Sequence, residues 1–171
     1  MGVGIVCFSF GLRAEPEEPN PSNWALAEAA TNAYASYQGK GPIAMVSQWE
    51  VNKALVRMRA PFAVDRSVEL NVDGSYLDSK GVWEEAKAVF EQKSVTEVVI
   101  IAQPFLHLTS LKQMVKSDGY GVLNFKIPPI LFDDSAKNTQ PWTRSKLRLL
   151  IYAVRLKLGL SHGHDGRQQV V

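Results

Sequence analysis

Residues 95–107 read Val-Thr-Glu-Val-Val-Ile-Ile-Ala-Gln-Pro-Phe-Leu-His. The run of β-branched residues is typical of a strand buried on both faces of a parallel sheet. The strand is expected to end at Ala102, and a polar loop with Gln103 and His107 leads into a helical segment. In open α/β sheets, ligands bind beyond the carboxyl ends of the strands. This stretch therefore predicts a place for a binding site and supplies a titratable side chain for it.

Strand-like and helix-like segments alternate along the rest of the chain. Runs rich in β-branched and aromatic residues predict strands at 4–10, 42–47, 68–72, 97–102 and 121–125. Helical spacing of apolar residues predicts helices at 22–37, 50–58, 78–90, 108–116 and 142–158. This alternation implies right-handed βαβ crossovers over a parallel sheet. We expect an α/β fold: a three-layer Rossmann-like domain with about five parallel strands and helices on both faces.

Length and composition are those of one globular domain. The chain has 171 residues, of which 46% are hydrophobic and 21% are charged. We assign residues 1–160 to a single Rossmann-like domain and residues 161–171 to a polar C-terminal tail. The lone cysteine, Cys7, lies in an apolar run, so no internal disulfide can form and a buried thiol is expected.

The distribution of apolar and charged residues limits the expected partners. No stretch reaches the ~18 consecutive apolar residues of a membrane-spanning helix, and the N-terminus lacks the basic leader of a signal peptide. We therefore expect a cytoplasmic protein without a transmembrane segment.

Residues 1–100 hold 9 basic and 13 acidic side chains, whereas residues 101–171 hold 10 basic and 4 acidic side chains. The basic part could meet an anionic ligand or surface, but no basic-aromatic module is present and we expect no nucleic-acid partner.

The motifs of several common enzyme classes are missing. No G-x-G-x-x-G follows the first strand, and there is no P-loop, G-x-S-x-G elbow or paired CxxC. This disfavours a standard nicotinamide dehydrogenase, P-loop ATPase or hydrolase. His162, His164 and Asp165 resemble a small metal motif, but they lie in the polar tail, so we expect no metal site.

Polar residues just past the predicted strand ends form the candidate site, because parallel strands bring these ends to one edge of the sheet. His107 can move protons near neutral pH, and Glu50 could orient it or bind a ribose-like hydroxyl. We expect Glu50 and His107 to be the catalytic or ligand-anchoring pair. The neighbouring positions expected to bind a ligand are Gln48, Tyr76, Asp78, Gln103, Gln140 and Arg144.

Each of these residues also has a purely structural explanation. His107 could cap a helix, and Glu50 suits the first turn of a helix because of the macrodipole. Ser22 is a good N-cap for the helix that follows it, and either Asp78 or Ser79 can cap the helix at 78–90. Arg144 could clamp a phosphate or carboxylate, but it also lies among the basic residues of the last helix and is as readily a surface residue.

Four short motifs occur in a fixed order. S-N-x-x-L-A begins the first helix at 22–27, S-Q-x-E stands at 47–50, a polar segment covers 76–79, and V-V-I-I-A-Q-P leads to His107. In this order they resemble the YdcF, SanA and ElyC group of bacterial domains, which are largely of uncharacterised function. The resemblance implies a Rossmann-like domain whose pocket is lined by the Glu50 and His107 segments, with Ser22 and Asn23 as further ligand-binding residues.

The same resemblance implies S-adenosylmethionine or a nucleotide as a candidate cofactor, since at least one member of the group binds S-adenosylmethionine. Other members are linked to envelope maintenance and carry membrane anchors. This chain departs from the group in two places. Ser110 stands where the group usually has an arginine, and the first loop is rich in acid and proline instead of glycine.

Two functional hypotheses follow. The first is a small-molecule-binding domain, or an enzyme acting on a nucleotide-like or phosphorylated ligand. The alternative is a non-catalytic interaction protein, or a peripheral envelope-associated one, that uses the apolar and basic last helix at 142–158 against a partner, a second copy or an anionic membrane. The commoner arrangement, in which that helix packs across the sheet, is the structural expectation.

Overall fold

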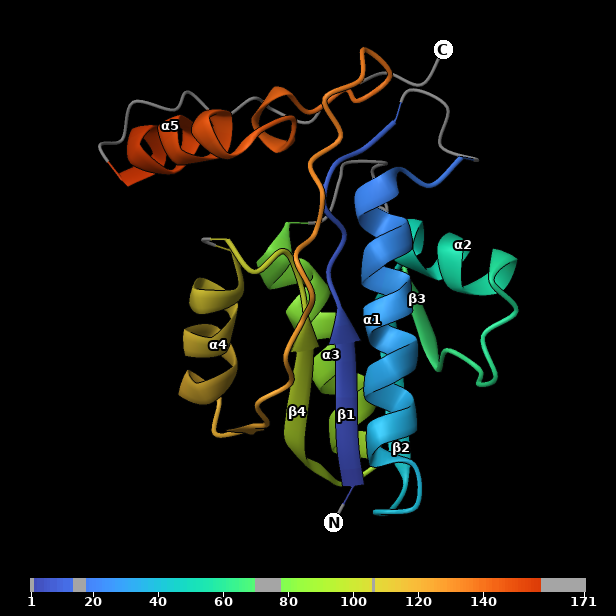
Figure 1. Cartoon of the computed structure of the whole chain (residues 1–171). Coiled ribbons are helices and arrows are strands. Elements are labelled where there is room, and N and C mark those ends of the chain that lie inside the picture. Colours follow the sequence, from blue (N-terminus) through green and yellow to red (C-terminus); the bar gives the residue numbers. More distant parts are fainter. Residues whose placement is uncertain (1, 14–17, 70–77, 106, 158–171) are drawn as a thin grey trace.

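The computed structural model describes residues 2–13, 18–69, 78–105 and 107–157. Five strands form one parallel sheet in the order β3-β2-β1-β4-β5 (Figure 1). Their bounds are β1 Gly2–Cys7, β2 Ile43–Gln48, β3 Arg66–Val68, β4 Val95–Ile101 and β5 Gly121–Val122. The helices are α1 Pro21–Tyr37, α2 Trp49–Arg57, α3 Ser79–Gln92, α4 His107–Ser117 and α5 Lys146–Lys157, with a short 3-10 helix η1 at Pro141–Thr143.

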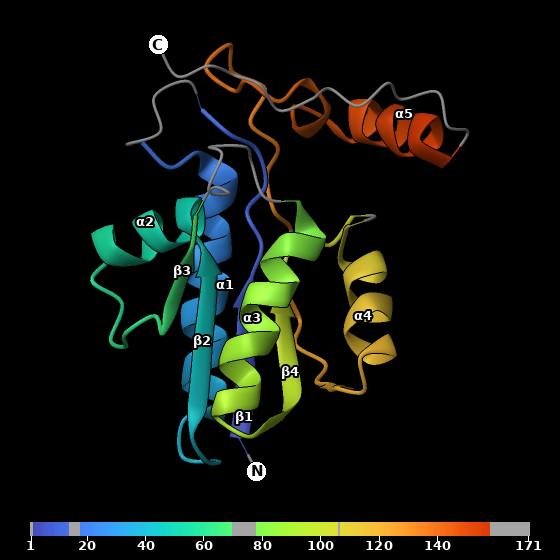
Figure 2. The same cartoon turned by 180° about the vertical axis from the view of Figure 1, so that it is seen from behind.

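Helices cover both faces of this sheet. α1 and α2 pack on one face, and α3 and α4 pack on the other, as the two opposite views show (Figures 1 and 2). The strand order runs outward from β1 to β3 and then returns to β4 on the other side of β1. The predicted three-layer Rossmann-like α/β fold is therefore confirmed, and its topological switch point lies between β1 and β4.

The central strands are continuous apolar runs because both of their faces are buried. Successive side chains of β1 point to opposite faces, so Ile5 packs with Leu26 and Leu55 under α1 and α2. Its neighbour Val6 packs with Trp83 and Phe90, which come from α3. Residues of β4 alternate in the same way between the two clusters. This double burial explains why β1 and β4 carry no alternating polar pattern.

Strand ends differ from the predicted ranges. β1 ends at Cys7, three residues earlier than expected, although the Phe8 amide still donates to Ile101 O at 2.9 Å. β5 has only two residues, and the chain leaves the sheet after Leu123, whose amide still donates to Val98 O at 2.9 Å. β3 is Arg66–Val68, and the rest of its predicted range from residue 70 on lies outside the described residues.

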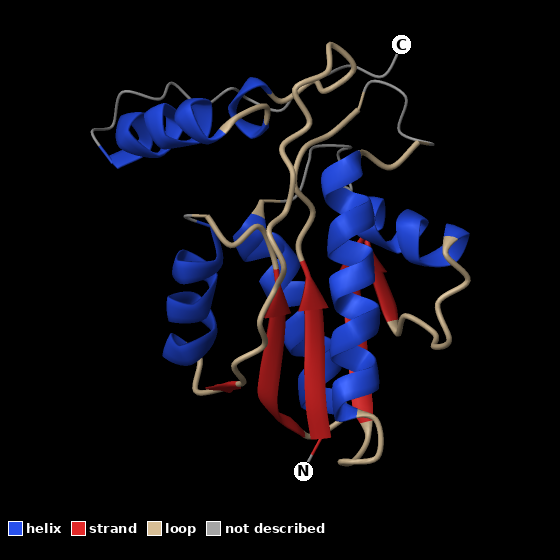
Figure 3. Ribbon diagram, in the orientation of Figure 1, coloured by secondary structure: helices blue, strands red, loops and turns tan. Residues whose placement is uncertain are grey.

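The last helix is placed differently from the expectation. α5 lies beyond the carboxyl edge of the sheet and does not pack across it, so that expectation is wrong (Figure 1). An extended segment, 123–132, takes the position of a covering helix and rises toward the carboxyl edge (Figure 3). Its apolar side chains, Ile127 and Ile130 among them, join the core under α1. With that face already covered, α5 has no sheet surface left to bury.

No helix within the described ranges is long and apolar enough to cross a membrane. The proposed tail at 161–171, with His162, His164 and Asp165, lies outside the described residues, as does Tyr76.

A tight contact between β1 and α3 gives a direct test of this packing. A Cβ on Gly4 would lie 2.8–2.9 Å from three ring atoms of Phe90. We expect Gly4→Ala to lower the free energy of unfolding by about 1–3 kcal/mol, because the ring or the strand must shift. Urea denaturation measures this loss, and Phe90→Leu should recover part of it in the double variant.

Gly2→Ala is the matched control in the same strand, since its nearest contact would be 3.4 Å. Equal stabilities of the two alanine variants would contradict the packing of Phe90 against Gly4.

Candidate functional site

Two buried glutamines stand at the carboxyl edge on either side of β1. Gln48, at the end of β2, accepts a hydrogen bond from the Ser9 amide through Oε1 at 3.0 Å. Gln103, just after β4, donates from Nε2 to Ile130 O at 3.2 Å and accepts from the Phe105 amide at 3.3 Å. Both side chains thus bond to backbone groups of loops that no longer pair with a neighbouring strand. A buried backbone group without such a partner would lower the stability of the fold.

The loop after β1 is held by the first turn of α1. Asn23 accepts from the Phe10 amide at 2.8 Å and donates to Gly11 O at 3.2 Å. Asn20 accepts from the Asn23 amide at 2.8 Å and donates to Phe10 O at 3.0 Å. Gly11 has φ +83°, and a Cβ there would lie 2.7 Å from Asn20 Nδ2. Loop and helix start are therefore one closely fitted unit that only glycine allows at this position.

The N-cap of α1 is Asn20, so the expectation that Ser22 caps this helix is wrong. The Ser22 hydroxyl instead donates to Leu131 O, which ties α1 to the extended segment. The sequence held a signal for Asn20 that was missed: an asparagine directly before a proline fits an N-cap followed by proline at the first helical position.

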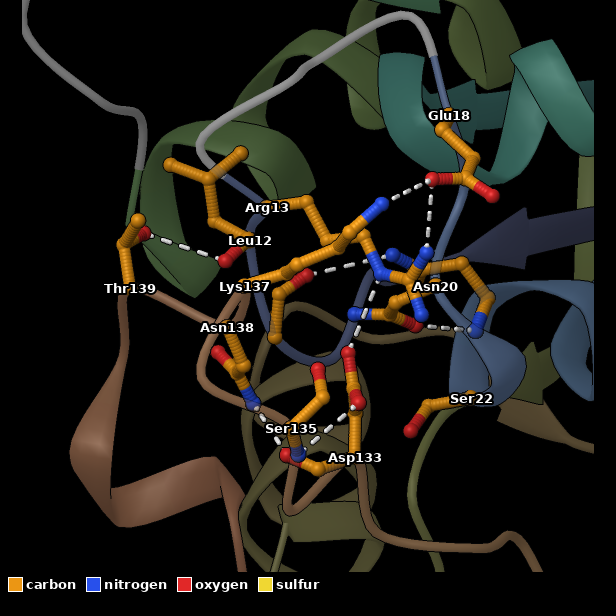
Figure 4. A network of polar contacts seen from close by, with 12 residues as sticks. Leu12, Arg13, Glu18, Asn20, Ser22, Asp133, Ser135, Lys137, Asn138 and Thr139 are labelled. Carbon is orange, nitrogen blue, oxygen red and sulfur yellow. Dashed lines mark hydrogen bonds and ion pairs between the residues drawn. The ribbon is translucent and has the colours of Figure 1, made fainter.

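A second set of contacts joins this loop to residues 133–144 (Figure 4). We call the joined residues 11–13, 18–20 and 133–144 the clasp. Arg13 pairs with Asp133 at 3.2 Å and with Glu18 at 2.9 Å. The Thr139 amide donates to Leu12 O at 2.7 Å. The clasp therefore connects segments that lie more than a hundred positions apart in the sequence.

Inside the clasp, Asn138 and Thr143 are buried and bond to each other at 2.9 Å. The Arg144 guanidinium donates to Asn138 O from Nε at 3.0 Å and again from a terminal nitrogen. The backbone amide of Gln140 donates to Asn138 Oδ1, and the backbone carbonyl of Gln140 accepts from the Thr143 hydroxyl. Arg144 was expected to clamp an anion. In this structure its guanidinium instead donates hydrogen bonds to backbone carbonyls of the clasp.

The structure brings a different pair together around His107. The His107 Nε2 atom lies 2.9 Å from the hydroxyl of Ser79, the first residue of α3. The His107 ring also contacts Phe8 edge-on, with the ring centroids 6.0 Å apart. Phe8 follows β1, and His107 begins α4 after β4. His107 therefore lies at the switch point of the sheet, whereas the sequence predicted only that it follows a strand end.

The environment of His107 keeps its ring neutral. Desolvation by burial lowers the pKa of His107 from 6.5 to about 4. The Nδ1 atom is buried and has no hydrogen-bond partner among the described residues. At neutral pH the imidazole is uncharged, with one nitrogen facing Ser79 and the other unsatisfied. Such a group can donate to or accept from a ligand.

Glu50 and His107 lie at the starts of helices that cover opposite faces of the sheet. Glu50 is a buried residue in the first turn of α2, on the face that α1 covers, whereas His107 begins α4 on the opposite face. The His107 ring bonds to Ser79, a residue that the sequence did not predict as part of the site. Asp78 caps α3 by accepting from the Gly81 amide at 2.8 Å, as one of its two readings predicted.

Comparison with protein-family models, curated proteins and solved structures found no significant match. Among the described residues, no group of three or more His, Cys, Asp or Glu side chains could hold a metal ion. What the site does is therefore inferred from its geometry.

The Asn23 contacts give a stability prediction. Asn23→Ala leaves the Phe10 amide and the Gly11 carbonyl buried without their partner, so we expect a loss on the order of 3 kcal/mol. Chemical denaturation measures it against Asn32→Ala, a change at an exposed position of the same helix. A loss below about 1 kcal/mol would show that water replaces the Asn23 side chain.

The lowered pKa of His107 predicts a pH dependence of stability. Between pH 4 and 6.5 the unfolded chain holds a proton at this residue that the folded protein does not, so stability rises with pH and is lost on acidification. From pH 7.5 to 5.0 the histidine should account for a loss of about 2 kcal/mol. Chemical denaturation at both pH values measures this loss, and the His107→Gln variant should lose about 2 kcal/mol less than the parent protein. An equal loss in the parent and the variant would contradict the burial of His107.

Proposed function

We propose that this domain binds a small polar metabolite, nucleotide-like or phosphorylated, at the carboxyl edge beside His107 and Ser79. The observation that carries the proposal is the buried, unpartnered Nδ1 of His107 at the switch point of the sheet. An unsatisfied buried nitrogen costs free energy in the ligand-free protein, and a ligand with a complementary group removes that cost. Switch points are where open α/β sheets bind their ligands.

Electrostatics support an anionic group in the ligand. Ser79 and His107 are the first residues of α3 and α4, so two helix N-termini converge where their side chains meet. Helix N-termini favour negative charge. An anion placed there would also favour protonation of His107 and raise its pKa from the value near 4. S-adenosylmethionine is the cofactor candidate that the resemblance to the YdcF, SanA and ElyC group adds.

A catalytic role would centre on the same two residues. A neutral imidazole within hydrogen-bond distance of a serine hydroxyl can accept its proton, which makes Ser79 a candidate nucleophile and His107 its base. Glu50, a buried residue in the first turn of α2, would serve in ligand binding or positioning. The other residues expected from the sequence, Ser22, Asn23, Gln48, Gln103 and Arg144, hold backbone groups and would shape the edge.

A thermal-shift screen tests the proposal. The full chain is incubated with nucleotides, S-adenosylmethionine, sugar phosphates and divalent metals, each as a separate class. A ligand at a hundredfold excess over its Kd should stabilise the protein by about 2.7 kcal/mol. We expect a shift with at least one phosphorylated or nucleotide-like compound, and at least tenfold weaker binding by His107→Asn and by Ser79→Ala.

The matched control is Ser117→Ala, which changes an exposed serine at the other end of α4. It should bind as the parent protein does. No shift with any ligand class, or equal binding by all three variants, would refute a ligand site at His107.

A further inference from the structure

α5 carries an apolar stripe that faces away from the protein. Leu147, Leu150, Ile151 and Val154 have relative exposures of 66, 44, 44 and 47%. Their spacing of i, i+3, i+4 and i+7 places all four on one side of the helix. Within the described residues, these four account for most of the large apolar side chains that remain exposed. A contiguous apolar surface of this kind is typical of an interaction site.

Basic residues border this stripe on both sides. At about 100° per residue, Arg148 and Arg155 lie on one flank, roughly a quarter turn from the centre of the stripe, and Lys146 lies on the other. All three are exposed. The helix contains no acidic residue. The outward face of α5 is therefore an apolar centre with a cationic border.

The opposite side of α5 anchors it to the domain. Leu149 is buried, and the Tyr152 ring stacks on Trp142 of η1 with centroids 4.9 Å apart. On the flank of the stripe, Lys146 Nζ lies 5.9 Å from the centre of the Phe105 ring and so reaches the loop after β4, which leaves Arg148 and Arg155 as the main cations of the border. Since η1 is itself held by the clasp through Thr143, the stripe has a defined orientation. α5 lies beyond the carboxyl edge of the sheet (Figure 2), and the side chains of its stripe are exposed.

We propose that α5 docks this domain on an anionic lipid surface. An apolar stripe bordered by lysine and arginine fits the boundary between acyl chains and headgroups: the apolar side chains enter it while the cations meet lipid phosphates. A second copy fits less well, because two α5 helices packed stripe to stripe would bring their basic borders together with no acid on either helix. A helix of 12 residues is too short to span a bilayer and suits binding in its plane.

Vesicle flotation tests the proposal with the full chain. We expect the protein to float with vesicles of phosphatidylcholine and phosphatidylglycerol, to bind pure phosphatidylcholine at least tenfold less, and to dissociate at high salt because exposed charges are screened. Ile151→Asp should reduce vesicle binding at least tenfold, because it places a charge in the apolar stripe. The double variant Arg148→Glu, Arg155→Glu should reduce binding at least tenfold, because it reverses two charges of the basic border. These positions are exposed, so both variants should keep the parent's unfolding temperature.

Two variants of α2 are the matched controls. Val56→Asp puts an acid in place of an exposed apolar residue, and Arg57→Glu reverses the charge of an exposed arginine, both on a helix other than α5. They should float as the parent does. Three results would overturn the proposal: no flotation with anionic vesicles, flotation that the α5 variants leave unchanged, or a dimer that light scattering detects and Ile151→Asp dissociates while lipid is ignored. Binding only to an acidic protein helix and not to vesicles would do the same.

Discussion

The carboxyl edge of this fold depends on hydrogen bonds from side chains to the backbone of residues 9–11. β1 is the central strand, so the chain that leaves it emerges in the interior, where no neighbouring strand continues the ladder. Gln48 bonds the Ser9 amide, and Asn23 bonds the Phe10 amide and the Gly11 carbonyl. Without these amide side chains, three backbone groups would be buried unsatisfied.

These hydrogen bonds determine which backbone and side-chain groups at the carboxyl edge are available to a ligand. In many Rossmann-like domains a glycine-rich loop after the first strand leaves helix amides open to a phosphate. Here Asn20 caps α1, and Asn23 bonds to the backbone of the loop after β1. The clasp ties the same loop to residues 133–144. The described residue at the switch point with a buried nitrogen still unsatisfied is His107, on the face of α3 and α4. The candidate site is therefore displaced from the α1 side of the sheet to the other side.

The clasp also explains the position of α5. The extended segment 123–132 fills the sheet face that a last helix would otherwise cover, and residues 133–144 then bond to the loop after β1. The chain reaches the start of α5 beyond the edge of the sheet, with only one side of the helix in contact with the domain. An exposed apolar stripe with a basic border follows from this route, and α5 lies beyond the carboxyl edge of the sheet, where α4 begins at His107 (Figure 1).

The sequence by itself determined the layers of this protein. The period of the apolar residues separated strands from helices, and the unbroken apolar run at 98–102 predicted a strand buried on both faces, because local periodicity reports which faces are covered. It also placed His107 at a strand end. Only the tertiary structure decided the partners: Ser79 for His107, backbone amides for Gln48 and Asn23, and Asn138 O for Arg144. Such pairs join residues from distant segments, and a polar side chain carries no local pattern that tells a ligand contact from a buried backbone contact. The position of α5 was decided in the same way, since an amphipathic pattern shows that one face of a helix needs cover but not what provides it.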